Sequence, residues 1–176
     1  MTGFLRMDKV AGFITFAAVY KLRFYFDWLK HFIVANSRHG THSPFVYRLV
    51  DEVIYADRQP DEPGDKVQRL IGRLIRRFEP EQIYAPGGHV DPGPVVDFAV
   101  IDGHSREKNP QAEVDTLWPR FHPGSVLVLT GCHDHAKALW LSLKARPDVT
   151  VTIDLFHVGL VFFRKGQAKE NFIIRF

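Results

Sequence analysis

Two short apolar runs in the second half of the chain, residues 95–101 and 125–129, constrain its fold most. Each run is bounded by glycine, proline or aspartate, which is typical of a strand buried on both faces of a sheet. A helical spacing of apolar residues follows each run, over residues 111–118 and 133–145. Strands that alternate with helices predict an α/β protein with a mainly parallel, doubly wound sheet.

Further extended stretches complete the predicted sheet. Residues 82–85 predict a short strand before a glycine-rich turn, and residues 150–155 and 160–163 predict a C-terminal antiparallel pair. Residues 172–176 predict a terminal extended piece. We therefore expect a sheet that is mostly parallel and becomes antiparallel near its end.

The first third of the chain is helical in pattern and rich in aromatic residues. An apolar run that starts near residue 10 continues to residue 33 and predicts one long helix. Ser43 followed by Pro44 is a typical helix start, because serine caps the first turn and proline fits the first helical position. That helix is predicted to end near residue 55, and a third amphipathic helix is predicted over residues 65–78.

We expect a single structural unit, in which residues 1–62 form an N-terminal helical segment packed on an α/β core of residues 63–176.

The net charge of +3 is small and accompanies no nucleic-acid-reading motif, so no nucleic-acid partner is predicted. Cys132 is the only cysteine, which excludes an intrachain disulfide and fits a reducing, cytoplasmic location.

The N-terminus has the outline of a signal peptide, because Arg6 and Lys9 precede the apolar run. No small-x-small cleavage pattern follows, and the uninterrupted apolar part from Val10 to Tyr20 leads into Lys21. That part is shorter than the roughly 20 residues that span a bilayer. We therefore expect no transmembrane segment. Docking of the aromatic helix against the domain or a partner subunit is expected, and a position on a membrane surface is the alternative.

Three blocks of residues carry a resemblance to a known family. Residues 95–104, Val-Val-Asp-Phe-Ala-Val-Ile-Asp-Gly-His, resemble the fourth strand of class I S-adenosylmethionine-dependent methyltransferases, in which the Asp-Gly-x-His type ending lies beside the cofactor. Residues 149–164 resemble the antiparallel pair that ends those domains. His39-Gly-Thr-His-Ser-Pro-Phe45 resembles the N-terminal signature of a bacterial, Bacteroidetes-type subgroup of methyltransferase-like proteins.

The resemblance implies a Rossmann-like, methyltransferase-type sheet with S-adenosylmethionine as cofactor, and it makes Gly87, Gly88 and Asp102 the cofactor-binding candidates. The chain departs from the family in the length of the segment that joins Gly88 to the predicted strand 95–101. Only residues 89–94 intervene, and a single parallel crossover already takes about a dozen residues. Strands two and three of the family are therefore expected to be absent, and the carboxylate that binds the ribose with them. Ala85 stands where the first strand's acidic residue is expected.

The expected sheet is consequently incomplete. Its predicted strand order is 82–85, 95–101, 125–129, 160–163 and 150–155, with the first strand as an exposed edge. Because proteins normally cover such an edge, we predict a homodimer that uses this strand or the N-terminal helices.

Polar residues follow the two central strands, at the end where open α/β sheets bind ligands. These are Asp102, His104, His133, Asp134 and His135. Asp102, His104 and His133 are the catalytic candidates. The resemblance implies that Asp102 is a base or a metal ligand, and capping of the following turn is the alternative. No metal site is predicted, because the spacing matches no closed zinc motif. Acidic residues that the subgroup carries after the second of these strands are replaced by Thr130 and Gly131.

The sequence therefore predicts a shortened methyltransferase-like protein with impaired or lost cofactor binding and catalysis, surviving as a binding or assembly module. Two alternatives stay open. One is an active methyltransferase with a rearranged or subunit-shared cofactor site. The other is a partner- or membrane-surface-docking module that uses the aromatic N-terminal helix. Whether the chain is an enzyme, and on what substrate, is left open by the sequence.

Overall fold

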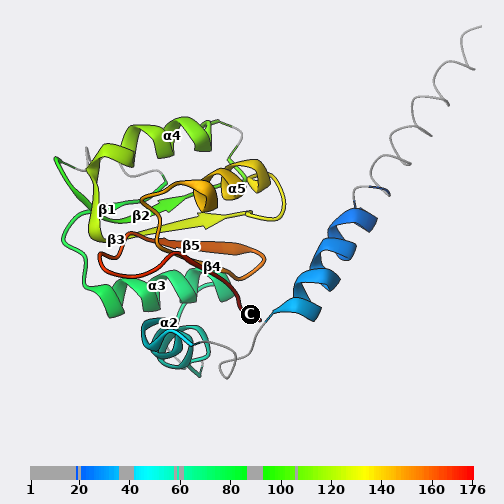
Figure 1. Ribbon diagram of the computed structural model, residues 1–176. Coiled ribbons are helices and arrows are strands. Elements are labelled where there is room, and N and C mark those ends of the chain that lie inside the picture. The colour runs from blue at the N-terminus through cyan, green and yellow to red at the C-terminus, as the bar shows by residue number, and fades with distance from the viewer. Residues whose placement is uncertain are drawn as a thin grey trace, which may run out of the picture. The chain divides into compact units, whose positions relative to one another are not determined.

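The computed structural model describes residues 19, 21–35, 42–57, 59, 62–86, 93–105 and 107–176. It divides the chain into two units, Met1–Val34 and Ala35–Phe176. In the first unit residues 21–34 form a helix (Figure 1). Its exposed large apolar side chains are Leu22, Tyr25, Phe26, Trp28, Leu29, Phe32, Ile33 and Val34. No helix among the described residues is long and apolar enough to cross a membrane. What this helix docks on stays a prediction.

The second unit is built on one sheet in the order β1-β2-β3-β5-β4-β6 (Figure 1). Its strands are β1 Ile83–Tyr84, β2 Val96–Ile101, β3 Phe121–Thr130, β4 Val151–Asp154, β5 Val158–Phe162 and β6 Glu170–Ile173. Strand β5 is antiparallel to both of its neighbours, whereas the other pairings are parallel. The predicted α/β class and the predicted order of the first five strands are confirmed. The terminal extended piece forms β6, which pairs with β4 at the outer edge.

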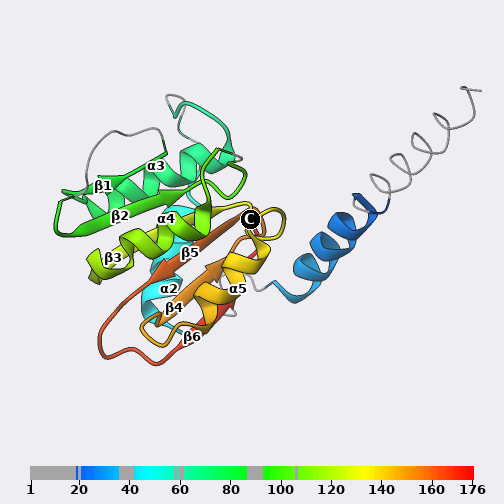
Figure 2. The same cartoon turned by 90° about the horizontal axis from the view of Figure 1, so that it is seen from above.

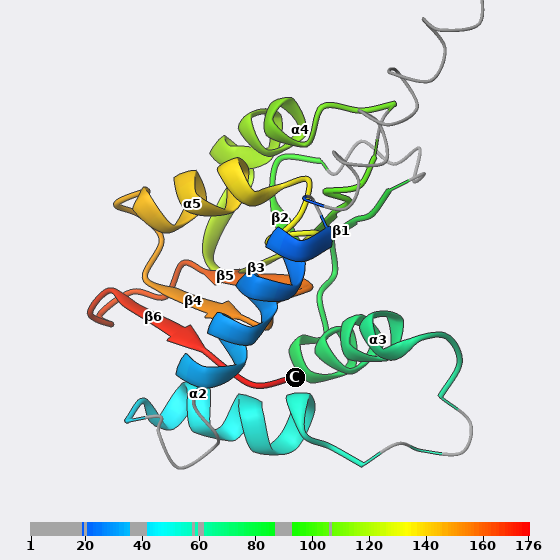
Figure 3. The same ribbon diagram turned by 90° about the vertical axis from the view of Figure 1, so that its right-hand side faces the viewer.

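Helices cover both faces of the sheet. The helices on one face are α2 Pro44–Leu49, the π-helix η2 Val50–Ile54 and α3 Lys66–Phe78, and those on the other are α4 Pro110–Leu117, the 3₁₀ helix η3 Trp118–Arg120 and α5 Lys137–Ala145. The two layers are seen above and below the sheet in Figure 1, from above in Figure 2 and from the side in Figure 3. Each face buries its own apolar cluster, because successive strand residues point to opposite faces.

The helix starts follow from local chemistry. The Ser43 side chain accepts from the backbone N–H of Val46, with proline at the first helical position, as predicted. Asp65 caps α3 in a capping box with Gln68, so each side chain accepts from the other's backbone N–H. The Ser43 cap is the one that the sequence predicts, and the Asp65 cap lies at the predicted start of the third helix. The helix that begins at Ser43 continues beyond Leu49 as η2 rather than as an α-helix.

Helix α5 begins at Lys137, so the prediction that it starts at residue 133 is wrong. The cause is Gly131, which adopts a left-handed φ of 67° directly after β3. Its carbonyl then accepts from the N–H groups of Asp134 and Ala136 in a turn. Residues 133–135 therefore lie in that turn, and their side chains do not follow a helical spacing.

Strand β1 pairs directly with β2 in parallel and lies at the edge of the sheet. Residues 85–95 make the whole connection between the two strands. Of these, residues 87–92 are outside the described part of the chain, so Gly87 and Gly88 lie there too. The edge position of β1 agrees with the prediction, and the homodimer stays a prediction.

Candidate functional site

The carboxyl ends of β2 and β3 meet because the two strands are parallel and in register, with Ile101 opposite Leu129. The turn that follows β2 and the turn that follows β3 therefore lie next to each other. All five polar residues singled out in the sequence belong to these two turns. The structure separates them into three groups with different partners.

Asp102 closes the turn after β2. Its Oδ1 accepts from the Thr130 hydroxyl at 3.0 Å and from the His104 backbone N–H at 3.0 Å. Thr130 Oγ1 in turn accepts from the N–H of Gly103 at 3.2 Å. This arrangement is the turn-capping role that the sequence offered as the alternative to a catalytic base. The sequence singled out Thr130 only because it replaces an acidic residue of the subgroup. In the structure its hydroxyl forms the hydrogen bonds that connect the two turns.

His104, Asp134 and His135 form a second group, which we call the His-Asp-His cluster. Asp134 Oδ2 lies 3.9 Å from His104 Nδ1 and 3.5 Å from His135 Nε2. The two imidazole rings stand edge to face with centroids 5.4 Å apart. The histidine side chains are about half exposed, at 51% and 53%, whereas that of Asp134 is 22% exposed.

His133 points away from this cluster, although it is adjacent to Asp134 in the chain. Its Nε2 lies 2.8 Å from Asp154 Oδ2, and its ring stacks on Phe156 with centroids 4.9 Å apart. Asp154, near the end of β4, is buried and also accepts from Trp140 Nε1 at 2.9 Å. A carboxylate inside the apolar stretch 151–155 was the signal that could have revealed this pair, because buried charges need partners.

Two glycines allow the turns to approach closely. A methyl carbon on Gly103 would overlap the Thr130 carbonyl oxygen and lie 2.5 Å from the Ala136 Cβ. A methyl carbon on Gly131 would lie 3.0 Å from the His104 Nε2. The His104 ring therefore rests against the backbone of Gly131, and close packing accounts for the glycine at position 103.

Cys132 is no candidate nucleophile. Its side chain is buried and its Sγ donates to the Phe156 carbonyl oxygen at 2.9 Å. Burial raises the pKa of this thiol well above its usual range. A reactive cysteine needs the opposite shift, because the thiolate is the nucleophile.

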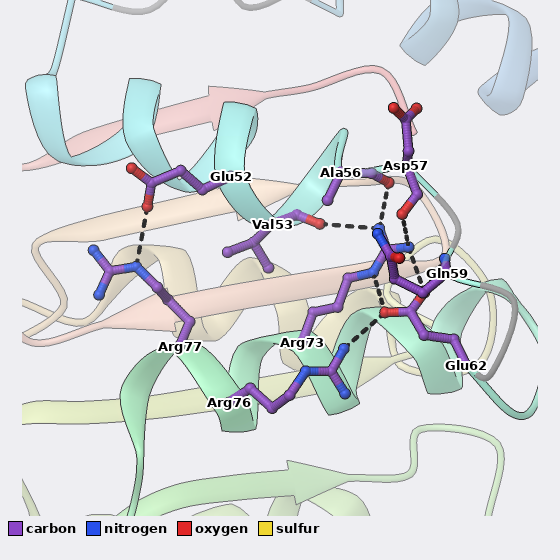
Figure 4. Close-up of a pocket in the computed structure, with 9 residues that line it drawn as sticks. All are labelled: Glu52, Val53, Ala56, Asp57, Gln59, Glu62, Arg73, Arg76 and Arg77. Atoms are coloured by element: carbon purple, nitrogen blue, oxygen red, sulfur yellow. Dashed lines mark hydrogen bonds and ion pairs between the residues drawn. The ribbon is translucent and has the colours of Figure 1, made fainter.

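The arginine-rich surface beside α3 forms a hollow (Figure 4). Its centre is a buried ion pair, in which Arg73 binds Glu62 through Nε at 2.8 Å and Nη2 at 2.5 Å. Arg73 also donates to the carbonyl oxygens of Val53 and Ala56. The arginine therefore joins η2, the following loop and α3, and its donors are used within the protein. We interpret this hollow as a structural ion-pair network.

The Glu62 carboxylate makes the stability of this network dependent on pH. Chiefly because Arg73 donates to it, the pKa of Glu62 is lowered from 4.5 to about 2. The stabilisation is therefore fully present above pH 4.5 and is lost as the pH falls towards 2. We expect Glu62→Gln to be less stable than wild type at pH 7, with a difference that shrinks over that acidic range. Urea unfolding at a series of pH values measures it.

Glu52→Gln is the matched control, because Glu52 pairs with Arg77 at 3.3 Å and both side chains are about half exposed. Exposed pairs contribute little, so its stability difference should be small at every pH. A Glu62→Gln difference that stayed constant between pH 5 and pH 2 would contradict the role assigned to the carboxylate.

Comparison of the chain with protein-family models, with curated protein sequences and with solved structures finds no match.

Proposed function

We propose that this chain is a shortened methyltransferase-type domain that has lost S-adenosylmethionine binding and methyl transfer, and acts as a non-catalytic binding or assembly module. The observation that carries the proposal is the connection of residues 85–95 between the edge strand β1 and its parallel neighbour β2. A complete cofactor site of that family needs two further strands after β1, and this connection has no room for them.

The polar residues beside the sheet support the same proposal. A general base has to reach a proton of its substrate, but Asp102 Oδ1 is engaged by Thr130 and by the backbone of His104. His133 is held by the buried Asp154. Ala85, directly after β1, has no carboxylate to offer. Two of the three catalytic candidates thus have a structural partner that accounts for them.

Calorimetric titration of the chain with S-adenosylmethionine, and separately with its demethylated product, tests the proposal. We expect no binding heat with either ligand at concentrations up to about 100 times a micromolar Kd, where a competent site would be saturated. Circular dichroism and a cooperative melt show that the sample is folded.

A micromolar Kd would overturn the proposal and favour an active methyltransferase with a rearranged or subunit-shared site. In that event Asp102→Asn should weaken binding if Asp102 contacts the cofactor. Glu52→Gln, a change at an exposed ion pair of η2, should leave it unchanged.

A further inference from the structure

The His-Asp-His cluster brings three metal-binding side chains together from two separate turns. One suitable donor atom from each of His104, Asp134 and His135 lies within 4.8 Å of the others. His104 follows β2, whereas Asp134 and His135 follow β3, so the parallel register of these strands creates the juxtaposition. The sequence places all three residues after the two central strands, but their spacing matches no closed zinc motif.

The distances in the cluster are not those of hydrogen bonds. A charge-assisted N–H···O bond measures about 2.7–2.9 Å, whereas Asp134 Oδ2 lies 3.9 Å from His104 Nδ1 and 3.5 Å from His135 Nε2. In a tetrahedral site with metal–ligand bonds of about 2.0–2.2 Å, the ligand atoms are roughly 3.4 Å apart. The two separations from Asp134 Oδ2 are within about half an ångström of that value, and the donor atoms of all three residues lie within 4.8 Å of one another.

One carboxylate oxygen of Asp134 lacks a hydrogen-bond donor among the described residues. This atom, Oδ1, is buried. A carboxylate oxygen removed from water without a donor costs free energy. A cation bound at the neighbouring Oδ2 would offset that cost by neutralising the carboxylate.

The backbone around the cluster is already fixed. Asp102 Oδ1 accepts a hydrogen bond from the His104 backbone N–H at 3.0 Å, and the Gly131 carbonyl oxygen accepts one from the Asp134 N–H at 3.0 Å. The absence of a side chain at Gly131 lets the His104 ring rest against the turn. The backbone positions of His104 and Asp134 are therefore fixed before a metal binds, which lowers the entropy cost of bringing these two ligands together.

From these observations we propose that His104, Asp134 and His135 bind one divalent transition-metal ion, for which Zn²⁺ is the probe. Imidazole nitrogens favour Zn²⁺, Co²⁺ and similar ions over Mg²⁺ and Ca²⁺. The three protein ligands leave a coordination position for water or a small ligand, and the half-exposed histidines place it at the protein surface. This proposal is independent of the proposed loss of S-adenosylmethionine binding.

Calorimetric titration of the metal-free full chain with Zn²⁺ tests the proposal. We expect one tight site per chain, and we expect Asp134→Asn and His104→Gln each to weaken it at least about tenfold, since even outer-shell partners of a metal are worth about 10–100-fold. Zn²⁺ should also raise the melting temperature of wild type but not of Asp134→Asn. Added Mg²⁺ should not compete.

His122→Gln is the matched control. This histidine is the second residue of β3 and also pairs with an aspartate, since His122 Nε2 lies 2.7 Å from Asp97 Oδ1. No third metal-binding donor joins this pair among the described residues. Its Zn²⁺ affinity should equal that of wild type. The proposal is overturned if no stoichiometric binding is seen. It is equally overturned if the folded Asp134→Asn and His104→Gln variants bind Zn²⁺ as well as wild type does.

Discussion

Replacing Gly159 with alanine is expected to destabilise the domain by about 3 kcal/mol, at the upper end of typical overpacking costs. A methyl carbon at this position would lie 2.5 Å from Trp140 Cζ3, 2.7 Å from Cε3 and 2.8 Å from Cη2. Trp140 is 1% exposed and cannot turn away. Gly159 cannot shift either, because β5 is paired on both sides, with Leu129 and Asp154 as its neighbours.

The measurement is thermal or urea unfolding, in which a loss of this size lowers the melting temperature by roughly 6–12 °C for a chain of this length. Gly72→Ala is the control: a methyl carbon there meets only Arg76 Nη1 at 3.8 Å. In the middle of α3 that change should be neutral or stabilising by up to about 1 kcal/mol. A Gly159→Ala variant as stable as wild type would show that the Trp140 ring can be displaced at little cost.

The parts of the fold that depend on local pattern could be predicted from the sequence. The runs around Phe98 and Val126 are apolar on both faces because both faces are covered by helices, and this pattern is legible without a structure. The helix starts at Ser43 and Asp65 depend on a side chain and a backbone group three residues away. Such short-range chemistry is contained in the sequence itself.

The parts of the site that depend on long-range register could not be predicted. Asp102 meets Thr130 and His133 meets Asp154 only because the sheet brings distant turns together. The start of α5 was misplaced because the left-handed φ of Gly131 redirects the chain after β3. The same change of direction points His133 towards Asp154 and leaves Asp134 and His135 beside His104. A helix that began at residue 133 would have brought different side chains together, so the misplaced helix start hid both groups of contacts.

Replacing Asp154 with alanine is the second change with a large expected effect. Asp154 is 3% exposed and its carboxylate accepts from Trp140 Nε1 at 2.9 Å and from the Phe156 N–H at 3.0 Å, and it pairs with His133. Its removal leaves buried donors without an acceptor, each costing about 1–3 kcal/mol. We expect a loss of about 3–5 kcal/mol in the free energy of unfolding, as for other buried pairs deprived of one partner.

Asp148→Ala separates burial from the hydrogen bond itself. Asp148 accepts from Trp118 Nε1 at 2.7 Å, the same kind of contact, but on the exposed surface. Water can replace that bond, so the cost should be below about 1 kcal/mol. Equal losses in the two variants, measured by urea unfolding, would mean that the buried position of Asp154 adds nothing. A large loss confined to Asp154→Ala would identify the Trp140, His133 and Phe156 contacts as the polar centre that fixes how α5 and the turn after β3 sit on the sheet.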